Sequence, residues 1–405
     1  MAGTISRSPE PKPGRLHSLD GLRGVAASIV LLHHSLLLVP TFSATYLGGG
    51  APSVGSVVWW LSYTPLKLFT AGGESVIVFF VLSGLVVSRP VFERATFDWY
   101  SYFPQRVLRL VLPIFGSIAL AAVLIGIVPQ NPFQGPGTWL TTYSTPQPNL
   151  GMFLSAVNLF GDGASFHVNN PLWSLRWELY FSLALPLFVI LALIARRRWV
   201  TGVATAVVLT VFGKWMNFEP LAFFPSFFLG ALLAVKLKDF GRVAGRINTR
   251  RSRDLIWSGI TVAGLGLLVA SWLTGPLPSD LRRVTLALQG LAPLGACVIV
   301  LACIGWGLMG RFLSSSVAQT AGKLSFSLYL THVPVLIFVS YLLRGRPLAS
   351  VILVGDLMAI AVAFGFYWLV ESRSHALSRQ VGRWASKRFD DHHAKSAKPQ
   401  VAIGD

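Results

Sequence analysis

Apolar residues are gathered into ten long stretches that are separated by short polar segments. Most of these stretches approach the roughly 20 residues that an α-helix needs to cross a bilayer. Several contain Pro or Gly, which a helix inside a bundle tolerates because neighbouring groups satisfy the freed backbone. The pattern predicts an all-α, polytopic membrane protein of about ten transmembrane helices, over 24–40, 72–89, 107–128, 172–195, 199–213, 220–236, 255–274, 286–308, 321–343 and 349–370.

The composition supports this interpretation. Of the 405 residues, 53% are hydrophobic and only 12% are charged, and the mean hydropathy is +0.61. Soluble globular proteins carry roughly 25% charged residues, so this chain has too few charges to cover a water-exposed surface. Soluble multidomain enzymes, disordered proteins and fibrous proteins are therefore disfavoured.

The formal net charge of +18 is explained by orientation. With the N-terminus in the cytoplasm, the cytoplasmic segments contain 27 Lys and Arg residues and the outer loops contain 6. Positive residues accumulate in cytoplasmic loops, so both termini are expected inside and no nucleic-acid partner is needed. We expect a cytoplasmic tail over 1–23, a membrane domain over 24–371, and a cytoplasmic, disordered tail over 372–405.

The first span contains ionisable residues, which are costly in a membrane and therefore suggest function. Arg23 and His34 are eleven residues apart, close to three helical turns, so they project from one face. His34 is interpreted as functional, although it could be a helix–helix hydrogen-bonding residue. His33 falls on another side, and the sequence leaves its role open.

The fourth span contains Arg176 and Glu178 in the segment NNPLWSLRWELYF. Residues two apart do not share a helix face, so the two side chains are expected to point in different directions. Glu178 is interpreted as part of a site; the structural alternative is an Arg–Glu pair that fixes helix packing.

Arg106 and Arg109 follow the second span in FPQRVLRLVLP and lie on one helix face. Either they anchor the helix at the cytoplasmic surface or they clamp a phosphate group of a cytosolic ligand. Cys297 and Cys303 cannot bridge each other along one helix, and no metal-binding or redox motif is present.

The ninth span carries Ser325, Tyr329 and His332 at a 4-3 spacing, which forms one polar stripe on an apolar helix. The stripe is either structural or one wall of a polar cavity. Ser83, next to Gly84 in the second span, lets a helix or a ligand approach closely, and packing is the favoured role.

Six segments together resemble the acyltransferase-3 family of integral membrane acyltransferases: LDGLRGVAA…LHH, FFVLSGLVVS, RVLRLVLP, PLWSLRWELYF, LSFSLYLTHVPV and the terminal VE. They occur in the family's order and cover nearly the whole chain. The family's first-span pattern, an Arg and a His with ten residues between them, falls on Arg23 and His34. Its paired arginines fall on Arg106 and Arg109.

The family's WSLxxE pattern falls on Trp173 and Glu178. Three departures are present: Phe326 where Tyr is common, Thr331 where Trp often precedes the His, and the run 73–75 (Gly-Glu-Ser) before FFVLSG. The last of these bears on acceptor or acyl preference and leaves the reaction class unchanged.

The resemblance implies transfer of an acyl group, usually acetyl from acetyl-CoA, to a hydroxyl group in the cytoplasmic membrane of a prokaryote. The acyl-CoA is a co-substrate, and no bound cofactor or metal is expected. The acceptor is expected to be a sugar, glycolipid, polysaccharide or glycosylated small molecule.

We expect acyl-CoA phosphates to meet Arg106, Arg109 and Arg23, with His34 as a general base. Glu178 or Asp20 would orient that His. The substrate-binding group is completed by Trp173, Ser83, Tyr329 and His332. A covalent acyl-His intermediate is equally compatible with the sequence.

A proton-coupled transporter or flippase is the alternative function, with His34, Glu178 and His332 as a proton relay. The sequence shows no inverted repeat of the kind found in many transporters. The paired cytoplasmic arginines also fit CoA better than a proton pathway.

Overall fold

The computed structural model of the chain describes residues 16–130, 139–145, 148–159, 167–275 and 282–396. Helices make up 84% of the structure, and the described residues form no β-strand, which confirms the all-α class.

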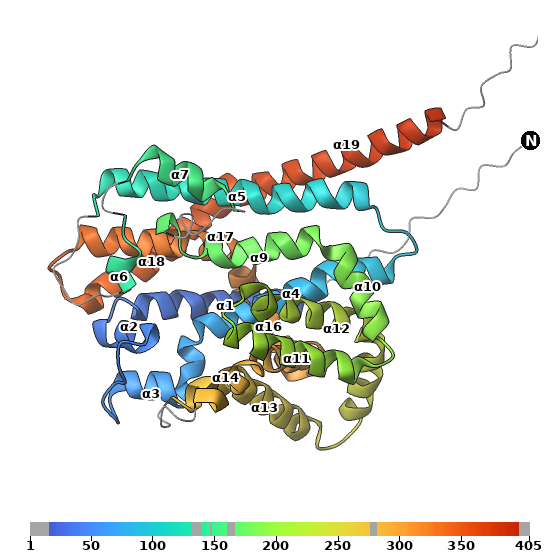
Figure 1. Ribbon diagram of the computed structural model, residues 1–405, viewed down its shortest axis with the longest axis horizontal. Helices are drawn as coiled ribbons and strands as arrows, with labels where there is room; N and C mark the ends of the chain where they lie inside the picture. Colours follow the sequence, from blue (N-terminus) through green and yellow to red (C-terminus); the bar gives the residue numbers. More distant parts are fainter. Residues whose placement is uncertain (1–15, 131–138, 146–147, 160–166, 276–281, 397–405) are drawn as a thin grey trace, which may run out of the picture.

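The helices follow one another along the chain in the order drawn in Figure 1. Most are α-helices; η1 is a 3₁₀-helix and η3 a single turn of π-helix. Their bounds are α1 (His17–Leu36), α2 (Pro40–Leu47), α3 (Val57–Tyr63), η1 (Pro65–Thr70), α4 (Gly72–Glu93), α5 (Trp99–Ile127), α6 (Trp139–Thr142), α7 (Leu150–Val157), α9 (Leu172–Leu183), α10 (Leu185–Ala195), α11 (Trp199–Trp215), α12 (Glu219–Asn248), α13 (Arg253–Leu273), α14 (Arg282–Gln289), α15 (Ala292–Gly305), α16 (Gly307–Leu313), α17 (Ser316–Leu342), α18 (Leu348–Phe366), η3 (Tyr367–Glu371) and α19 (Ser372–Ser396).

Seven helical segments among the described residues are long and apolar enough to cross a membrane. Two bent pairs, α1 with α2 and α9 with α10, raise the number to nine if each pair is one span. The remaining predicted stretch, 199–213, corresponds to α11, whose 17 residues are short for a span. The chain is an integral membrane protein, while the count of ten and the side of each terminus stay predictions.

Both bends occur where the sequence pattern predicts continuous helices, over 24–40 and 172–195. The chain turns by 109° between α1 and α2 and by 72° between α9 and α10. In each case a proline, Pro40 or Pro186, lies in the first turn of the second helix. Proline has no N–H to continue the preceding helix and suits the start of a new one. The first span therefore ends at Leu36, shortly after His34.

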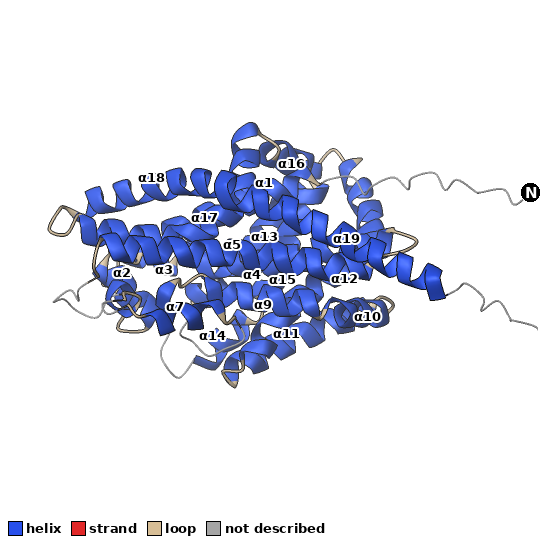
Figure 2. Ribbon diagram, turned by 90° about the horizontal axis from the view of Figure 1, so that it is seen from above, coloured by secondary structure: helices blue, strands red, loops and turns tan. Residues whose placement is uncertain are grey.

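The long helices run side by side in a bundle, as Figures 1 and 2 show. α1 and α18 both pack along α17, α4 packs along α12, and α5 packs along α19. α17 is the most enclosed helix, because 94% of its apolar window is buried. The predicted site residues thus lie on helices in the interior of the bundle or at its border, namely α1, α4, α5, α9 and α17.

The C-terminal segment differs from its prediction. Residues 372–396, expected to be disordered, form the helix α19, which packs along α5 and extends beyond the bundle (Figure 1). Its contacts with α5 include the stacked rings of Phe389 and Tyr100, with centroids 3.5 Å apart. The predicted N-terminal tail is also shorter than expected, because α1 begins at His17; residues 1–15 and 397–405 lie outside the described part.

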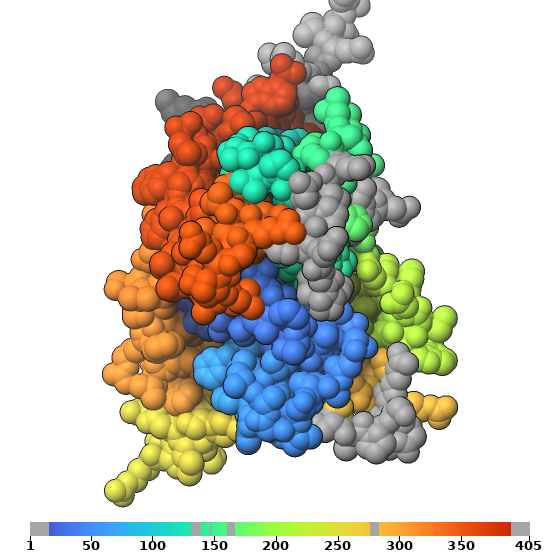
Figure 3. All heavy atoms as spheres, turned by 90° about the vertical axis from the view of Figure 1, so that its left-hand side faces the viewer, coloured from blue at the N-terminus to red at the C-terminus, as the bar shows by residue number. Residues whose placement is uncertain are grey.

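At the end of the bundle away from the projecting part of α19, the helices α2, α3 and η1 form the blue surface in Figure 3. Lys67 of η1, predicted in an outer loop, is almost fully buried there. Its ammonium lies 3.8 Å from the ring centroid of Trp272 and donates a hydrogen bond to the Thr70 carbonyl. Burial lowers the pKa of Lys67, and the nearby Glu74 carboxylate partly opposes this change.

Helices α4 and α12 approach closely at two facing glycines, Gly84 and Gly230. A Cβ atom on Gly84 would lie 2.2 Å from the Phe227 carbonyl oxygen, and one on Gly230 would lie 2.2 Å from the Val81 carbonyl oxygen. Both distances are far below van der Waals contact, so the helices could not keep this spacing with any larger residue.

We therefore predict that Gly84→Ala lowers the free energy of unfolding by roughly 1–3 kcal/mol, the usual cost of overpacking. The measurement is denaturation of the purified protein in detergent. Gly266→Ala in α13 is the control, because no heavy atom lies within 4 Å of its Cβ position. Equal stabilities of the two variants would contradict the close packing.

Candidate active site

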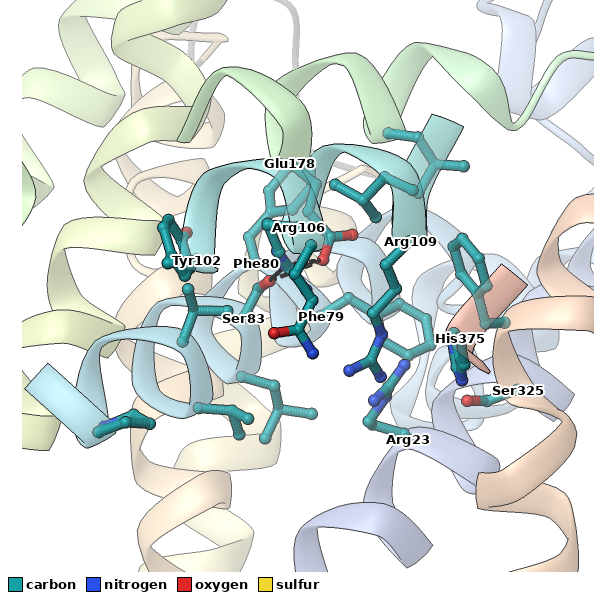
Figure 4. Close-up of a pocket in the computed structure, with 18 of the residues that line it drawn as sticks. Arg23, Phe79, Phe80, Ser83, Tyr102, Arg106, Arg109, Glu178, Ser325 and His375 are labelled. Atoms are coloured by element: carbon teal, nitrogen blue, oxygen red, sulfur yellow. Dashed lines mark hydrogen bonds and ion pairs between the residues drawn. The ribbon is translucent and has the colours of Figure 1, made fainter. Parts of the chain in front are cut away.

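A cavity of about 570 Å³ opens among α1, α4, α5, α9 and α17. Figure 4 shows its polar side chains pointing inward from several helices. Six of the nine predicted site residues line it: Arg23, Ser83, Arg106, Arg109, Glu178 and Tyr329. The other three, Trp173, His34 and His332, lie outside the cavity lining.

A hydrogen-bonded ion pair between α5 and α9 forms one wall of the cavity. Arg106 Nη2 donates to Glu178 Oε1 over 2.7 Å and to Ser83 Oγ over 3.2 Å, and Ser83 Oγ donates to the same carboxylate oxygen over 2.8 Å. Arg106 Nε also donates to Ser182 Oγ over 3.0 Å. The guanidinium is thus held in one orientation, and its charge is balanced by Glu178.

Arg176 points in a different direction from Glu178, as expected from their spacing. Arg176 pairs with Glu219 at 3.0 Å, on another side of α9 from Glu178. The two side chains pair with different helices, Arg176 with α12 and Glu178 with α5.

Arg23 and Arg109 form a second basic group in the cavity. Figure 4 shows their guanidinium groups extending towards each other from α1 and α5. Among the described residues, neither forms a salt bridge within 4 Å, although Glu371 interacts electrostatically with both. Two neighbouring cations with little direct compensation favour an anionic ligand.

Glu371, which the sequence pattern places near water, is buried and lines the cavity. Its carboxylate accepts a hydrogen bond from Ser327 Oγ over 2.5 Å and lies 3.8 Å from His375 Nε2. It supplies negative charge on the side of the cavity where Arg23 and Arg109 meet.

His34 and His332 form a hydrogen-bonded pair behind the cavity. His34 Nδ1 lies 2.9 Å from the Val30 carbonyl oxygen and 3.2 Å from His332 Nε2, and His332 Nδ1 lies 2.9 Å from the Leu328 carbonyl oxygen. Because a carbonyl only accepts, each Nδ1 carries the proton. This tautomer leaves a lone pair on His34 Nε2.

His332 and the side chain of Asn170 both interact with the His34 ring, and its orientation by Glu178 or Asp20 stays a prediction. The hydrogen bonds of Glu178 go to Arg106 and Ser83. His34 is partly exposed, whereas His332 is fully buried.

Tyr329 connects the cavity with the histidine pair. Its side chain lines the cavity, its ring centroid lies 5.9 Å from that of His332, and its hydroxyl is 2.6 Å from Ser174 Oγ. Ser325 also lines the cavity. The polar stripe of α17 thus runs from the cavity wall at Ser325 and Tyr329 to His332 beside His34.

Trp173 and His33 are placed by packing. Trp173 packs against Phe223, with ring centroids 5.3 Å apart, and does not line the cavity. The buried His33 ring packs so closely against Gly72 that a Cβ atom there would lie 2.5 Å away, and its Nδ1 atom has no hydrogen-bond partner among the described residues.

Sequence reasoning missed Asp356, a carboxylate within α18. It accepts a hydrogen bond from Ser35 Oγ, the residue that follows His34, and so ties the last turn of α1 to α18. The signal was available, because an acidic residue inside the apolar stretch 349–370 is costly unless it has a partner. His375 was missed because it lies in the segment expected to be disordered.

Comparison with known proteins identifies a family. The sequence profile of the acyltransferase domain matches residues 16–368. Acyltransferase MdmB of Streptomyces mycarofaciens is 26% identical, over 83% of each chain. O-acetyltransferase PaAT-1 of Phomopsis amygdali is also 26% identical, over 92% of this chain and 86% of the relative. No solved structure matches significantly.

The pairing of Arg106 with Glu178 can be tested by a double-mutant cycle. Arg106→Ala, Glu178→Ala and the double variant should give a coupling of roughly 0.5–3 kcal/mol in the free energy of unfolding, because the two groups share one network. The measurement is denaturation in detergent. The pair that Arg176 forms with the exposed Glu219 is the control and should couple by less than about 1 kcal/mol; a smaller coupling at Arg106 than at Arg176 would contradict the assignment.

Proposed function

The chain belongs to the acyltransferase-3 family, and from this premise we propose that it transfers an acyl group, in the simplest case acetyl, from acyl-CoA to a hydroxyl group of an acceptor. The observation that carries the proposal is the basic cavity, whose lining residue Tyr329 lies next to the hydrogen-bonded pair of His332 and His34. Within the proposal, the protein lies in the cytoplasmic membrane and takes its donor from the cytosol.

Acyl-CoA suits the cavity because of its charge and its length. Its nucleotide carries several phosphate charges, and Arg23, Arg94 and Arg109 are cations of the cavity that lack a salt bridge to a described carboxylate. Arginine binds phosphate through two parallel hydrogen bonds. In the proposed complex the phosphates lie at these arginines, and the pantetheine arm carries the thioester inward past Tyr329.

His34 is the proposed general base. Its Nε2 takes the proton of the acceptor hydroxyl while the hydroxyl oxygen attacks the thioester carbonyl carbon. The C–S bond then breaks, the ester is formed, and the proton passes from His34 to the CoA sulfur as the thiol leaves. The hydrogen bond between His34 Nδ1 and His332 Nε2 supports this role, because it fixes the ring and the tautomer.

We propose for Glu178 a different role from the one expected of it. Its bonds to Arg106 and Ser83 support a positioning role, in which it holds the Arg106 guanidinium at the cavity wall. Arg106 then contributes a fixed donor beside Arg109 rather than a second free cation.

The acceptor is proposed to be a carbohydrate, glycolipid, polysaccharide or glycosylated small molecule. The name of the Phomopsis relative, an O-acetyltransferase, supports a hydroxyl acceptor and an acetyl group. The transporter alternative does not account for acyl transfer, which is the activity of the family to which the chain belongs.

We predict that His34→Ala lowers acyl transfer by about 10²–10⁴-fold, the usual contribution of a general base, while acyl-CoA still binds. The measurement is acetyl-CoA consumption in lipid nanodiscs with a panel of sugar acceptors, beside CoA binding by calorimetry. His17→Ala is the control, because His17 is exposed at the start of the same helix. Full turnover in His34→Ala would refute the base; substrate counterflow without turnover in the wild type would favour a transporter.

A second prediction concerns donor affinity. Arg109→Gln should weaken acetyl-CoA binding by about tenfold or more, because one charge-assisted phosphate contact is lost. Arg176→Gln, whose partner Glu219 lies away from the cavity, should leave the affinity unchanged. Equal dissociation constants for wild type and Arg109→Gln would show that the phosphates bind elsewhere.

A further inference from the structure

The cavity wall continues beyond the part of the chain that matches the family. The match ends at residue 368, yet Glu371 of η3 and His375 of α19 line the cavity. Figure 4 shows His375 on the same side of the cavity as Arg23, Arg109 and Ser325. A helix outside the matched domain therefore contributes directly to the proposed donor site.

The face of α19 that meets the bundle is defined by close packing on α5. A Cβ atom on Gly382 would lie 2.9 Å from Ser101 Oγ and 3.2 Å from Gln105 Cβ, and both Ser101 and Gln105 line the cavity. Residues 375, 379 and 382 follow the 4-3 spacing of one helix face. Arg379 follows His375 by about one turn and is exposed, so it lies at the edge of this face.

The charges around His375 are almost all positive. Arg23, Arg106, Arg109 and Arg379 interact with it electrostatically, and Glu371 is the carboxylate 3.8 Å from its Nε2 atom. Arg379 is exposed, and no described carboxylate lies within 4 Å of its guanidinium. It therefore extends the basic surface from the cavity to its outer rim, where an anionic ligand group can reach it from water.

We propose that α19 is part of the donor site and that Arg379, with His375 beside it, binds the ribose 3′-phosphate of CoA. This inference rests on the proposed function. If the thioester lies inside, near Tyr329 and His34, the nucleotide end of the extended molecule lies at the rim. The 3′-phosphate is a dianionic group at that end, and Arg379 is a cation there without a salt bridge to a described carboxylate.

The test compares the binding of CoA and 3′-dephospho-CoA to the full-length protein in nanodiscs by calorimetry. The wild type should bind CoA about tenfold more tightly than dephospho-CoA. Arg379→Gln should remove this preference by weakening CoA alone, with the affinity for dephospho-CoA unchanged. Arg388→Gln is the matched control, because it removes the same charge from an exposed position on the opposite face of α19.

The outcomes separate the two proposals. If Arg379→Gln keeps the wild-type preference for CoA, or if the wild type has no preference, the role of Arg379 is overturned while the donor assignment stands. If neither ligand binds the wild type, the proposed function itself fails. Because Arg379 is exposed, its substitution should leave the melting temperature unchanged, which a thermal scan of the same samples checks.

Discussion

The contact between α1 and α17 is the constraint on which the site depends. A Cβ atom on Gly24 would lie 2.5 Å from the Gly322 backbone nitrogen, and one on Gly322 would lie 2.1 Å from the Asp20 carbonyl oxygen. The two backbones therefore nearly touch at the start of α1. This approach places Arg23 beside the cavity wall of α17 and, further along both helices, brings His34 within hydrogen-bond distance of His332.

Charge inside the bundle is arranged in two ways. Arg106 is bound to Glu178 and Ser83, so its position is fixed and its charge is balanced. Arg23 and Arg109 lie beside each other and share only the electrostatic influence of Glu371 and other nearby groups. Two adjacent cations without a bound carboxylate repel each other, and an anionic ligand that enters the cavity would offset that repulsion. The same arrangement therefore explains both the stability of one wall and the ligand preference of the other.

The sequence predicts the membrane class and the facial relation of Arg23 and His34, because both depend only on hydrophobicity and helical periodicity. It does not predict that Glu178 pairs with Arg106 and not with His34, because that depends on how α5 and α9 pack. It also misses α19: residues 372–396 are too polar to resemble a span, and their helix is stabilised by packing on α5. The buried state of Glu371 follows from that same packing.

The division between the arginine-lined cavity and the histidine pair behind Tyr329 has a metabolic consequence under the proposed function. The arginines contact the nucleotide, which is identical in acyl-CoA and in the released CoA, so this part of the binding energy does not distinguish substrate from product. Free CoA then competes with its acylated form for the same cavity. The rate of transfer would follow the ratio of acylated to free CoA in the cytosol, which ties modification of the acceptor to the carbon and energy supply of the cell.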